Sequence, residues 1–325
     1  MAPPEKDYDV SIIGAGPSGL ACAIAALRAS LTYVVLEKGC LVNSIFHFPT
    51  NMVMFSTPEL LEIGDVPFIV ASEKPTRTDL LKYYRAVTDH FQLNLKLFEK
   101  VESVSGKVGG FNLSTSKASY SARHIVVATG QYDTPNLMNI SGEASQKVSH
   151  YYTEPHPFYK KNVAIVGGKN SAVEAALDLF KHGANVTVIH RGDDFGRSVK
   201  YWILPDIKNR VREKKIVVRF NSTVKEIRPD SIIVKNGATE ETLPNDFVFA
   251  LTGYRPDTTF MRGLGIEFGE GETPNHDPDT LATNVPGVYI AGVITAGSEG
   301  SQVFIENSRD HGKKIIGHIL HGTKT

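Results

Sequence analysis

The hydrophobic pattern near the start of the chain follows the order strand, turn, helix, strand. Residues 8–13 are largely apolar, residues 14–19 are rich in glycine, and residues 20–27 are apolar again. A further apolar run at 32–36 ends at Glu37. Short apolar runs bounded by turn residues are typical of buried strands. This order predicts a parallel βαβ unit that opens an α/β domain.

The same pattern returns in the middle of the chain. An apolar run at 161–166 leads into a second glycine turn, and a helix is predicted from Ser171 to His182. Residues 183–189 then favour another strand, which ends at His190 and Arg191. The chain therefore contains a second copy of the opening βαβ unit.

Three more apolar runs end in small residues, at 123–130, 246–253 and 286–292. Such strand ends allow a backbone to approach a ligand closely. Together with the repeat, they predict an α/β fold with two Rossmann-like, three-layer dinucleotide-binding domains. The second domain is inserted into the first, so that residues 1–133 and 248–325 form one domain and residues 134–247 form the other.

The remaining segments give weaker signals. Residues 38–68 lack a sustained helical or strand periodicity and are predicted to be a loop-rich segment packed on the core. Apolar residues at helical spacing predict an amphipathic helix over Thr78–Phe91, and short antiparallel strands are expected around the turn at Gly109. We expect a final helix from near Ser301 to Leu320, with its N-terminal dipole facing an electron-rich ring.

The first glycine turn has the features of a dinucleotide-binding turn. Gly14 permits the tight turn, Gly16 admits a pyrophosphate to the backbone, and Gly19 lets the helix pack close to the sheet. The helix N-terminus adds free N–H groups and the positive end of its dipole. Glu37 stands where a carboxylate accepts hydrogen bonds from an adenosine ribose. This half of the chain is therefore predicted to bind a nucleotide with free ribose hydroxyls.

The second unit ends in basic residues in place of an acid. His190, Arg191 and Arg197 favour a nucleotide that carries a 2′-phosphate, so we assign NADPH to this half. Lys169 takes the position where a small residue usually admits the pyrophosphate. A site for ribose hydroxyls beside a site for a 2′-phosphate indicates FAD and NADPH, because hydride passes readily from nicotinamide to flavin.

Composition narrows the class of protein. The chain has 35 basic and 35 acidic residues, which gives no reason to propose nucleic acid or an anionic membrane as a partner. No apolar stretch reaches the roughly 18 residues that span a bilayer, and the N-terminus lacks an apolar signal core. Two cysteines without CxxC spacing fit a reducing compartment, so a cytoplasmic location is expected.

Several motifs together resemble the low-molecular-weight thioredoxin reductase superfamily, and specifically the bacillithiol disulfide reductase-like flavoproteins. The motifs extend through nearly the whole chain, at 14–19, 44–50, 63–68, 167–172, 202–205 and 289–294. The resemblance implies an FAD-containing, NADPH-oxidising homodimer that reduces a low-molecular-weight disulfide. It also implies that two domains reorient so that nicotinamide reaches the flavin.

The resemblance further implies which residues hold each cofactor. For FAD they are Gly14, Gly16, Pro17, Ser18, Gly19, Glu37, Lys38, Asn43, Ser44, Thr50, Val101, Ala128, Thr129, Gly130, Gly292, Val293, Gln302 and Val303. For NADPH they are Gly168, Lys169, Asn170, Ser171, His190, Arg191, Arg197 and Gly253.

Two departures from the family concern sulfur. The Cys-x-x-Cys dithiol of thioredoxin reductases is replaced by His150–Pro155, which excludes a dithiol relay there. Ser18 stands where the bacillithiol disulfide reductases have a cysteine after the proline, and a serine cannot form a mixed disulfide. Cys22, one turn further on, is a weak catalytic candidate, since a thiol on a buried helix usually serves packing.

The catalytic residue therefore stays unassigned, and the flavin ring is the expected reactive group. Four histidines are candidate proton donors to a leaving thiolate, and no pair of them has metal-ligand spacing: His47, His150, His156 and His311. Besides disulfide reduction, two hypotheses remain open. One is a ferredoxin- or flavodoxin-NADP reductase, which the missing dithiol favours. The other is a redox-sensing flavoprotein with slow turnover.

Overall fold

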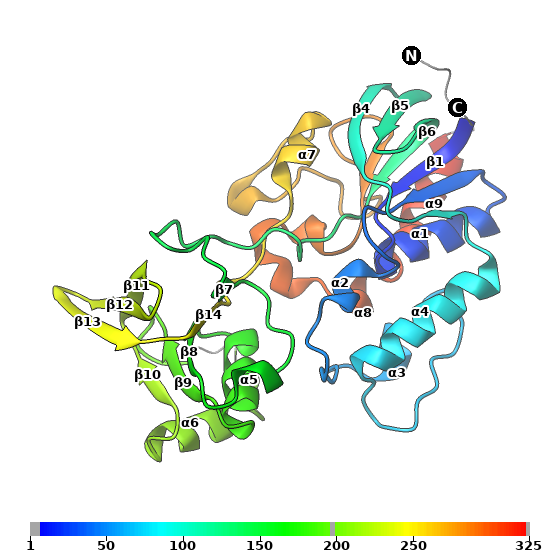
Figure 1. Ribbon diagram of the computed structural model, residues 1–325. Coiled ribbons are helices and arrows are strands. Elements are labelled where there is room, and N and C mark those ends of the chain that lie inside the picture. Colours follow the sequence, from blue (N-terminus) through cyan, green and yellow to red (C-terminus); the bar gives the residue numbers. More distant parts are fainter. Residues whose placement is uncertain (1–6, 196–198, 323–325) are drawn as a thin grey trace. The chain divides into compact units, whose positions relative to one another are not determined.

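In a computed structural model the chain divides into two compact units. The structure describes residues 7–195 and 199–322, with backbone only for 298–301. The first unit comprises Met1–His47, Asn51–Thr134 and Tyr254–Thr325, and the second comprises Phe48–Thr50 and Pro135–Gly253. Figure 1 shows the chain leaving the first unit, building the second and returning. The predicted α/β class, with one domain inserted into another, is confirmed.

The first unit is built on a seven-stranded sheet in the order β3-β2-β1-β6-β5-β4, with β15 also paired to β6. The strands β1, β2, β3, β6 and β15 are parallel, whereas β4, β5 and β6 pair antiparallel. Their bounds are Asp7–Ile13 for β1, Tyr33–Leu36 for β2, Leu95–Lys96 for β3, Val101–Lys107 for β4, Gly110–Thr115 for β5, Ser119–Val127 for β6 and Val288–Ile290 for β15.

Two helices of the first unit pack tightly against each other, α1 (Pro17–Arg28) and α9 (His311–Gly322). The contact is close because Gly312 has no side chain: an added Cβ would lie 2.5 Å from the Ala21 carbonyl oxygen. The other helical segments of this unit are α2 (Asn43–Phe46), α3 (Pro58–Leu61), α4 (Arg77–Phe91), α7 (Thr258–Gly263), η2 (Glu270–Glu272), η3 (Gly292–Gln302) and α8 (Ile305–Ser308).

Helix α4 matches the predicted amphipathic helix. It begins with a capping box in which Thr76 and Asp79 satisfy each other's backbone N–H groups, and it buries Leu80, Tyr84 and Val87. Residues 38–68, predicted to lack regular structure, contain only the short helices α2 and α3.

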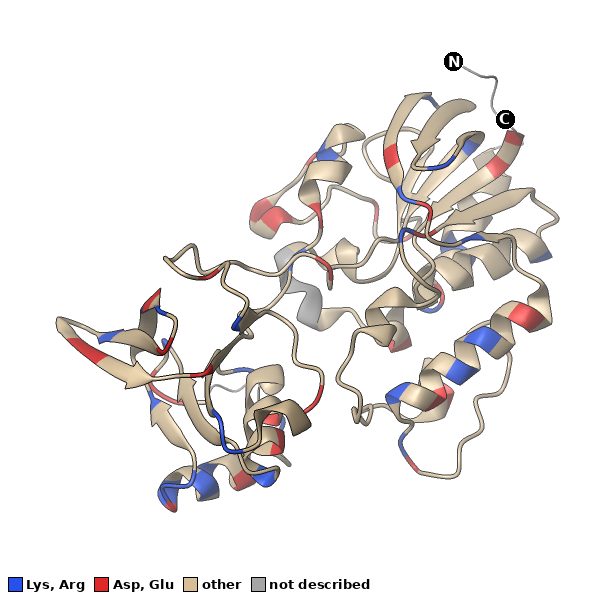
Figure 2. Cartoon of the chain, viewed as in Figure 1, with Lys and Arg blue, Asp and Glu red and all other residues tan. Residues whose placement is uncertain are grey.

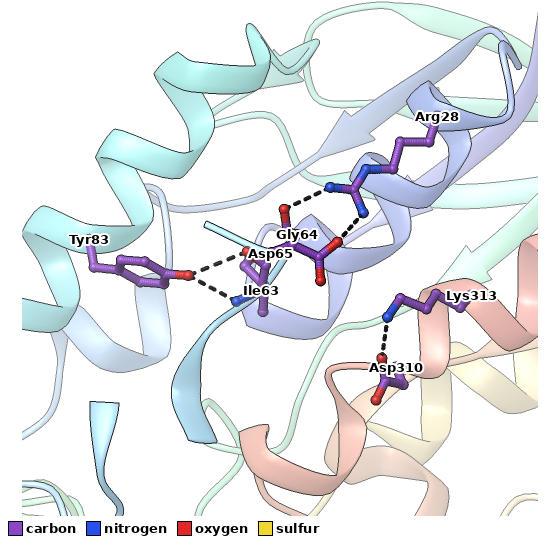
Figure 3. A network of polar contacts seen from close by, with 7 residues as sticks. All are labelled: Arg28, Ile63, Gly64, Asp65, Tyr83, Asp310 and Lys313. Carbon is purple, nitrogen blue, oxygen red and sulfur yellow. Dashed lines mark hydrogen bonds and ion pairs between the residues drawn. The ribbon is translucent and has the colours of Figure 1, made fainter. Parts of the chain in front are cut away.

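A polar network ties the segment after α3 to its neighbours (Figure 3). The Arg28 guanidinium of α1 donates to the Asp65 carboxylate at 2.7 Å and to the Gly64 carbonyl at 2.7 Å. From α4, the Tyr83 hydroxyl accepts the Ile63 N–H at 2.9 Å. Two side chains from different helices thus fix one short stretch of backbone beside α1.

The second unit has three layers. Its parallel sheet has the order β10-β9-β8-β14-β7, and a separate antiparallel sheet has the order β11-β12-β13. One face of the parallel sheet packs on helices, and the other packs on β11 and β12. The elements are β7 (Val148–Ser149), η1 (His156–Phe158), β8 (Asn162–Val166), α5 (Asn170–Lys181), β9 (Asn185–Ile189), α6 (Leu204–Arg212), β10 (Val217–Arg219), β11 (Ser222–Ile227), β12 (Ser231–Asn236), β13 (Thr239–Pro244) and β14 (Phe247–Ala250).

The end of the second unit and the form of the last helix differ from the predictions. The predicted second domain ends at residue 247, but β14 pairs with β8, so the second unit continues to Gly253. The continuous final helix is interrupted: η3 ends at Gln302, Val303 is extended, and α8 and α9 follow separately. The Ser308 hydroxyl donates to the Phe304 carbonyl at 2.6 Å, and such local bonds compete with helix continuation.

The α1–α9 contact makes a stability prediction. We expect Gly312→Ala to lower the free energy of unfolding by about 1–3 kcal/mol, because the new methyl group overlaps the α1 backbone. Gly317→Ala on the same helix is the control, since a Cβ there meets nothing within 4 Å and alanine favours helix. Urea unfolding of both variants measures the difference. Equal stability of the two would contradict this packing.

Candidate functional site

The first glycine turn lies between β1 and α1 at the carboxyl edge of the sheet. Gly14 has φ +112°, and a Cβ there would overlap the Ala128 carbonyl at the end of β6. A Cβ on Gly19 would overlap the Gly14 carbonyl. By contrast, a Cβ on Gly16 would meet nothing within 4 Å. Gly14 and Gly19 are therefore required by the turn itself, whereas the space beside Gly16 is open to a ligand.

Glu37 locks this turn in place. One carboxylate oxygen accepts the Ala15 N–H at 2.8 Å and the other accepts the Gly39 N–H at 2.7 Å. The side chain is 7% exposed. Each carboxylate oxygen has a further lone pair, so Glu37 can also accept a ribose hydroxyl. The residue thus both fixes the glycine turn and offers an acceptor at the end of β2.

The end of β6 adds a buried polar atom that lacks a partner among the described residues. The Thr129 hydroxyl is buried and makes no hydrogen bond in that part of the chain. Buried hydroxyls are nearly always paired in folded proteins. The next residue, Gly130, has φ +70°, and its Cβ position is 3.9 Å from the Ser44 hydroxyl of α2. An unpaired hydroxyl beside an open glycine turn fits a bound nucleotide.

A second group of side chains surrounds the start of α1. The Ser18 and Ser308 hydroxyls lie 3.2 Å apart, at hydrogen-bond distance. A Cβ on Gly292 would lie 2.7 Å from the Ser18 hydroxyl, and the Gly292 N–H donates to His311 Nδ1 at 3.1 Å. Burial, and more weakly the nearby Lys314, lowers the pKa of His311 to about 4. His311 is therefore neutral near pH 7 and carries its proton on Nε2.

The other residues predicted for the first site have mixed surroundings. Pro17 is the first residue of α1, and the Asn43 side chain accepts the Cys40 N–H at 3.4 Å. Lys38 forms an ion pair with Asp133 at 3.0 Å. Thr50 belongs to the second unit, where its N–H donates to Thr153, and Val101 is buried in the core at the start of β4. Val293 and Gln302 lie in η3, and Val303 is the extended residue that follows.

The second glycine turn repeats the first with one exchange. Gly167 has φ +149°, and a Cβ there would lie 2.5 Å from the Leu251 carbonyl, as Gly14 approaches Ala128 in the first unit. His190 follows β9 just as Glu37 follows β2. Its ring stands directly over Gly168, where a Cβ would overlap it. An imidazole therefore takes the place in the second unit that a carboxylate has in the first.

Basic side chains gather at this turn, although charges of both signs are interspersed over the chain as a whole (Figure 2). Lys169 is the exposed N-cap residue of α5, and Arg191 is exposed directly after His190. Burial, and then the Arg191 charge, lowers the pKa of His190. Lys200, which was not predicted from the sequence, also lies beside this turn: its backbone N–H donates to the Asn170 side chain at 2.8 Å, and its ammonium pairs with Glu174 at 2.8 Å.

The remaining residues predicted for the second site are placed as follows. Ser171 is exposed in the first turn of α5. Gly253 follows β14 with φ +94°, and its carbonyl accepts the Asn136 N–H at 2.9 Å. Arg197 lies outside the described residues. The strand order places Gly253 on the β14 side of β8 and Arg191 on the β9 side, so the two flank the glycine turn.

Neither thiol of the chain is positioned as a nucleophile. Cys22 is 0% exposed, and burial raises its pKa to about 12. Its backbone is the surface on which Gly312 packs. Cys40 lies beside Asn43, to which its Sγ donates at 3.5 Å, and burial raises its pKa as well. Since the thiolate is the reactive form, the raised pKa values lower the reactivity of both thiols near pH 7.

Metal-ligand groups and membrane-spanning helices were not found in the described part of the chain. Among residues 7–195 and 199–322, no group of three or more His, Cys, Asp and Glu side chains could hold a metal ion. In the same ranges, every helix is too short or too polar to cross a bilayer. The arrangement can bind two nucleotides, one at each glycine turn, with the donors and acceptors described above.

The depressed pKa of His311 predicts how stability depends on pH. The folded protein resists protonation down to about pH 4, whereas the unfolded chain takes up a proton near pH 6.5. The stability is therefore complete above pH 6.5 and is lost as the pH falls from 6.5 toward 4, by at most about 1.4 kcal/mol per pH unit. Urea unfolding between pH 5 and pH 7 measures this loss, which we expect to be smaller in His311→Gln. An unchanged slope in that variant contradicts the assignment.

Comparison with known proteins identifies the group to which these features belong. Residues 11–292 match the family described as pyridine nucleotide-disulphide oxidoreductase. The bacilliredoxin reductase Bdr of Bacillus subtilis (strain 168) is 44% identical over 311 residues, which cover 95% of this chain and 96% of that protein.

Two solved structures, both titled bacillithiol disulfide reductase Bdr (YpdA), also match. The one from Bacillus cereus has a TM-score of 0.95 at 43% identity and covers 97% of this chain and 99% of its own. The one from Staphylococcus aureus has a TM-score of 0.95 at 42% identity and covers 98% of this chain and 99% of its own. With two nucleotide-type glycine turns and this similarity along nearly its whole length, the chain belongs to the pyridine nucleotide-disulphide oxidoreductase family and is a flavin oxidoreductase.

Proposed function

We propose that this protein is an FAD-containing reductase that oxidises NADPH and reduces a low-molecular-weight disulfide. The observation that carries the proposal is the similarity, over 95% of the chain, to relatives named for the reduction of bacilliredoxin and of bacillithiol disulfide. In the net reaction NADPH, a proton and one disulfide give NADP⁺ and two thiols. The same resemblance supports a homodimer as the working form.

The first unit is proposed to hold FAD. The open side of Gly16 and the N-terminal dipole of α1 suit the pyrophosphate, and Glu37 suits the adenosine ribose. The unpaired Thr129 hydroxyl would gain a partner from the bound nucleotide. A bound flavin supplies a two-electron carrier between nicotinamide and disulfide. The chain's part is to bind, to orient and to keep His311 neutral beside Gly292.

The second unit is proposed to hold NADPH. Arg191 is exposed at the strand end where the adenosine ribose lies in such folds, and a guanidinium pairs well with a 2′-phosphate. Lys169 and the first turn of α5 suit the pyrophosphate. A carboxylate at the position of His190 would repel the 2′-phosphate, so the exchange of Glu37 for His190 between the two units favours NADPH over NADH.

A second candidate function is a ferredoxin- or flavodoxin-NADP reductase. It is favoured by the state of the thiols: Ser18 stands at the family's cysteine position, Cys22 is completely buried and Cys40 is bound to Asn43. An enzyme without a usable thiol could pass electrons from the flavin to a small redox protein. A redox-sensing flavoprotein would instead be reduced by NADPH and turn over slowly with every acceptor.

One experiment separates these functions. The purified holoenzyme is reduced with NADPH without air, and flavin reoxidation is followed with bacillithiol disulfide, flavodoxin, ferredoxin and oxygen. We expect rapid reoxidation by the disulfide. Faster reoxidation by flavodoxin or ferredoxin would establish the second candidate, and slow reoxidation by all four would indicate a sensor. A protein that binds no flavin, or stays oxidised with NADPH, would refute the proposal entirely.

The double variant Cys22→Ala/Cys40→Ala is the matched control for this experiment. We expect it to reduce the disulfide within about threefold of the wild-type rate, because Cys22 is buried and the pKa of each thiol is raised. If flavin reduction is intact but disulfide turnover is lost, one of the two thiols takes part in the reaction.

Nucleotide choice gives a further prediction. We expect Arg191→Ala to raise the KM for NADPH by about tenfold or more with little change for NADH, since only NADPH loses a charge-assisted contact. Arg212→Ala is the charge-matched control, because Arg212 is exposed at the far end of α6 and contacts Asn209. Steady-state kinetics with both nucleotides provide the measurement. Equal effects on NADPH and NADH would exclude Arg191 as the 2′-phosphate contact.

A further inference from the structure

The segment 199–203 is fixed against the first turn of α5. Val199 is buried in the core of the second unit, and Ile203 packs on the same core before α6 begins. Between them, the Lys200 N–H donates to the side chain of Asn170, the first residue of α5. Asn170 is two residues beyond Gly168, so this segment runs beside the second glycine turn.

Two aromatic rings project from this fixed segment. Tyr201 is 82% exposed and Trp202 is 48% exposed, and their rings stand perpendicular with centroids 5.0 Å apart. The Lys200 ammonium lies 5.6 Å from the Trp202 centroid and pairs with Glu174 of α5 at 2.8 Å. The backbone and the ion pair therefore hold an indole close to α5 while about half of its surface faces solvent.

The strand order indicates which end of a bound nucleotide this indole would contact. Trp202 comes two residues before α6, which packs on the helical face of the sheet and leads into β10, the partner of β9. On this β9–β10 side, Phe195 packs edge-on against Phe220 at 5.2 Å, and Phe220 lies beside the His190 ring at 6.3 Å. Gly253 and β14 are on the opposite side of β8. In this fold the adenosine end lies over the second strand of the unit, here β9. Trp202 is thus on the adenosine side.

We propose that Trp202 stacks on the adenine ring of the bound pyridine nucleotide, an inference that rests on the proposed function of the second unit. An indole offers a large flat π-face to a purine, and the Lys200–Glu174 pair limits its motion. Lys200 is a positioning residue in this arrangement. Arg191 would contact the 2′-phosphate of the same adenosine, so charge and stacking act on one half of the nucleotide.

The test uses the complete holoenzyme and adenosine 2′,5′-bisphosphate, a fragment that lacks nicotinamide. We expect Trp202→Leu to weaken its binding by about tenfold in calorimetry, and Trp202→Phe to restore most of the affinity. Tyr159→Leu is the control, since Tyr159 is an exposed ring that packs on Gly183 at the other end of α5. Equal affinity of wild type and Trp202→Leu would overturn the stacking.

A second measurement does not depend on a variant. Trp202 is the single tryptophan of the chain, so intrinsic tryptophan emission reports on this ring alone. We expect the fragment to quench that emission with the same Kd that calorimetry gives. Binding without any change in emission would overturn the inference but leave the proposed function intact. A wild-type protein that binds neither the fragment nor NADPH would refute the proposed function itself.

Discussion

The hydrogen bond from the glycine-turn backbone to Glu37 is the constraint on which the first unit depends. A helix that starts at the carboxyl edge of a parallel sheet leaves its first N–H groups without partners. Here the turn before α1 is held because Glu37 accepts the Ala15 N–H, while Gly14 and Gly19 allow β1, β6 and α1 to approach within backbone contact. The open side of Gly16 leaves space beside this turn. In the proposed function, one carboxylate therefore couples the shape of the turn to the preference for a ribose.

In the proposed function, the second unit uses the same scaffold as the first but prefers a different nucleotide. Gly167 makes the same close approach to β14 that Gly14 makes to β6, so the turn is conserved in shape. His190 then covers Gly168 where Glu37 holds Ala15, and Arg191 stands beside it. Replacement of an acid by an imidazole and a guanidinium reverses the local charge. In the proposed function, glycine and strand packing set the shape of each nucleotide site, and the residues that end the second strand set the choice of nucleotide.

The side chains at the start of α1 include a hydroxyl and a buried thiol. The position after Pro17 carries a hydroxyl that lies against Ser308 and Gly292, and the nearby thiol of Cys22 is enclosed between α1 and α9. A buried thiol with a raised pKa is a packing group. The thiol nearest the start of α1 is therefore a packing group and not an exposed nucleophile.

The two glycine turns, the strand after each helix and the insertion of one unit into the other could be predicted from the sequence, as could the positions of Glu37 and His190 directly after a strand. These signals are local, because turn geometry and hydrophobic period depend on neighbouring residues. Other features could be seen only in the folded chain: Thr129 is buried without a partner among the described residues, His311 bonds to Gly292, β14 belongs to the second unit, and Lys200 lies beside α5. Each of these features depends on residues that are far apart in the chain. Their contacts are set by the packing of the whole core, and local hydrophobic periodicity in the sequence does not report them.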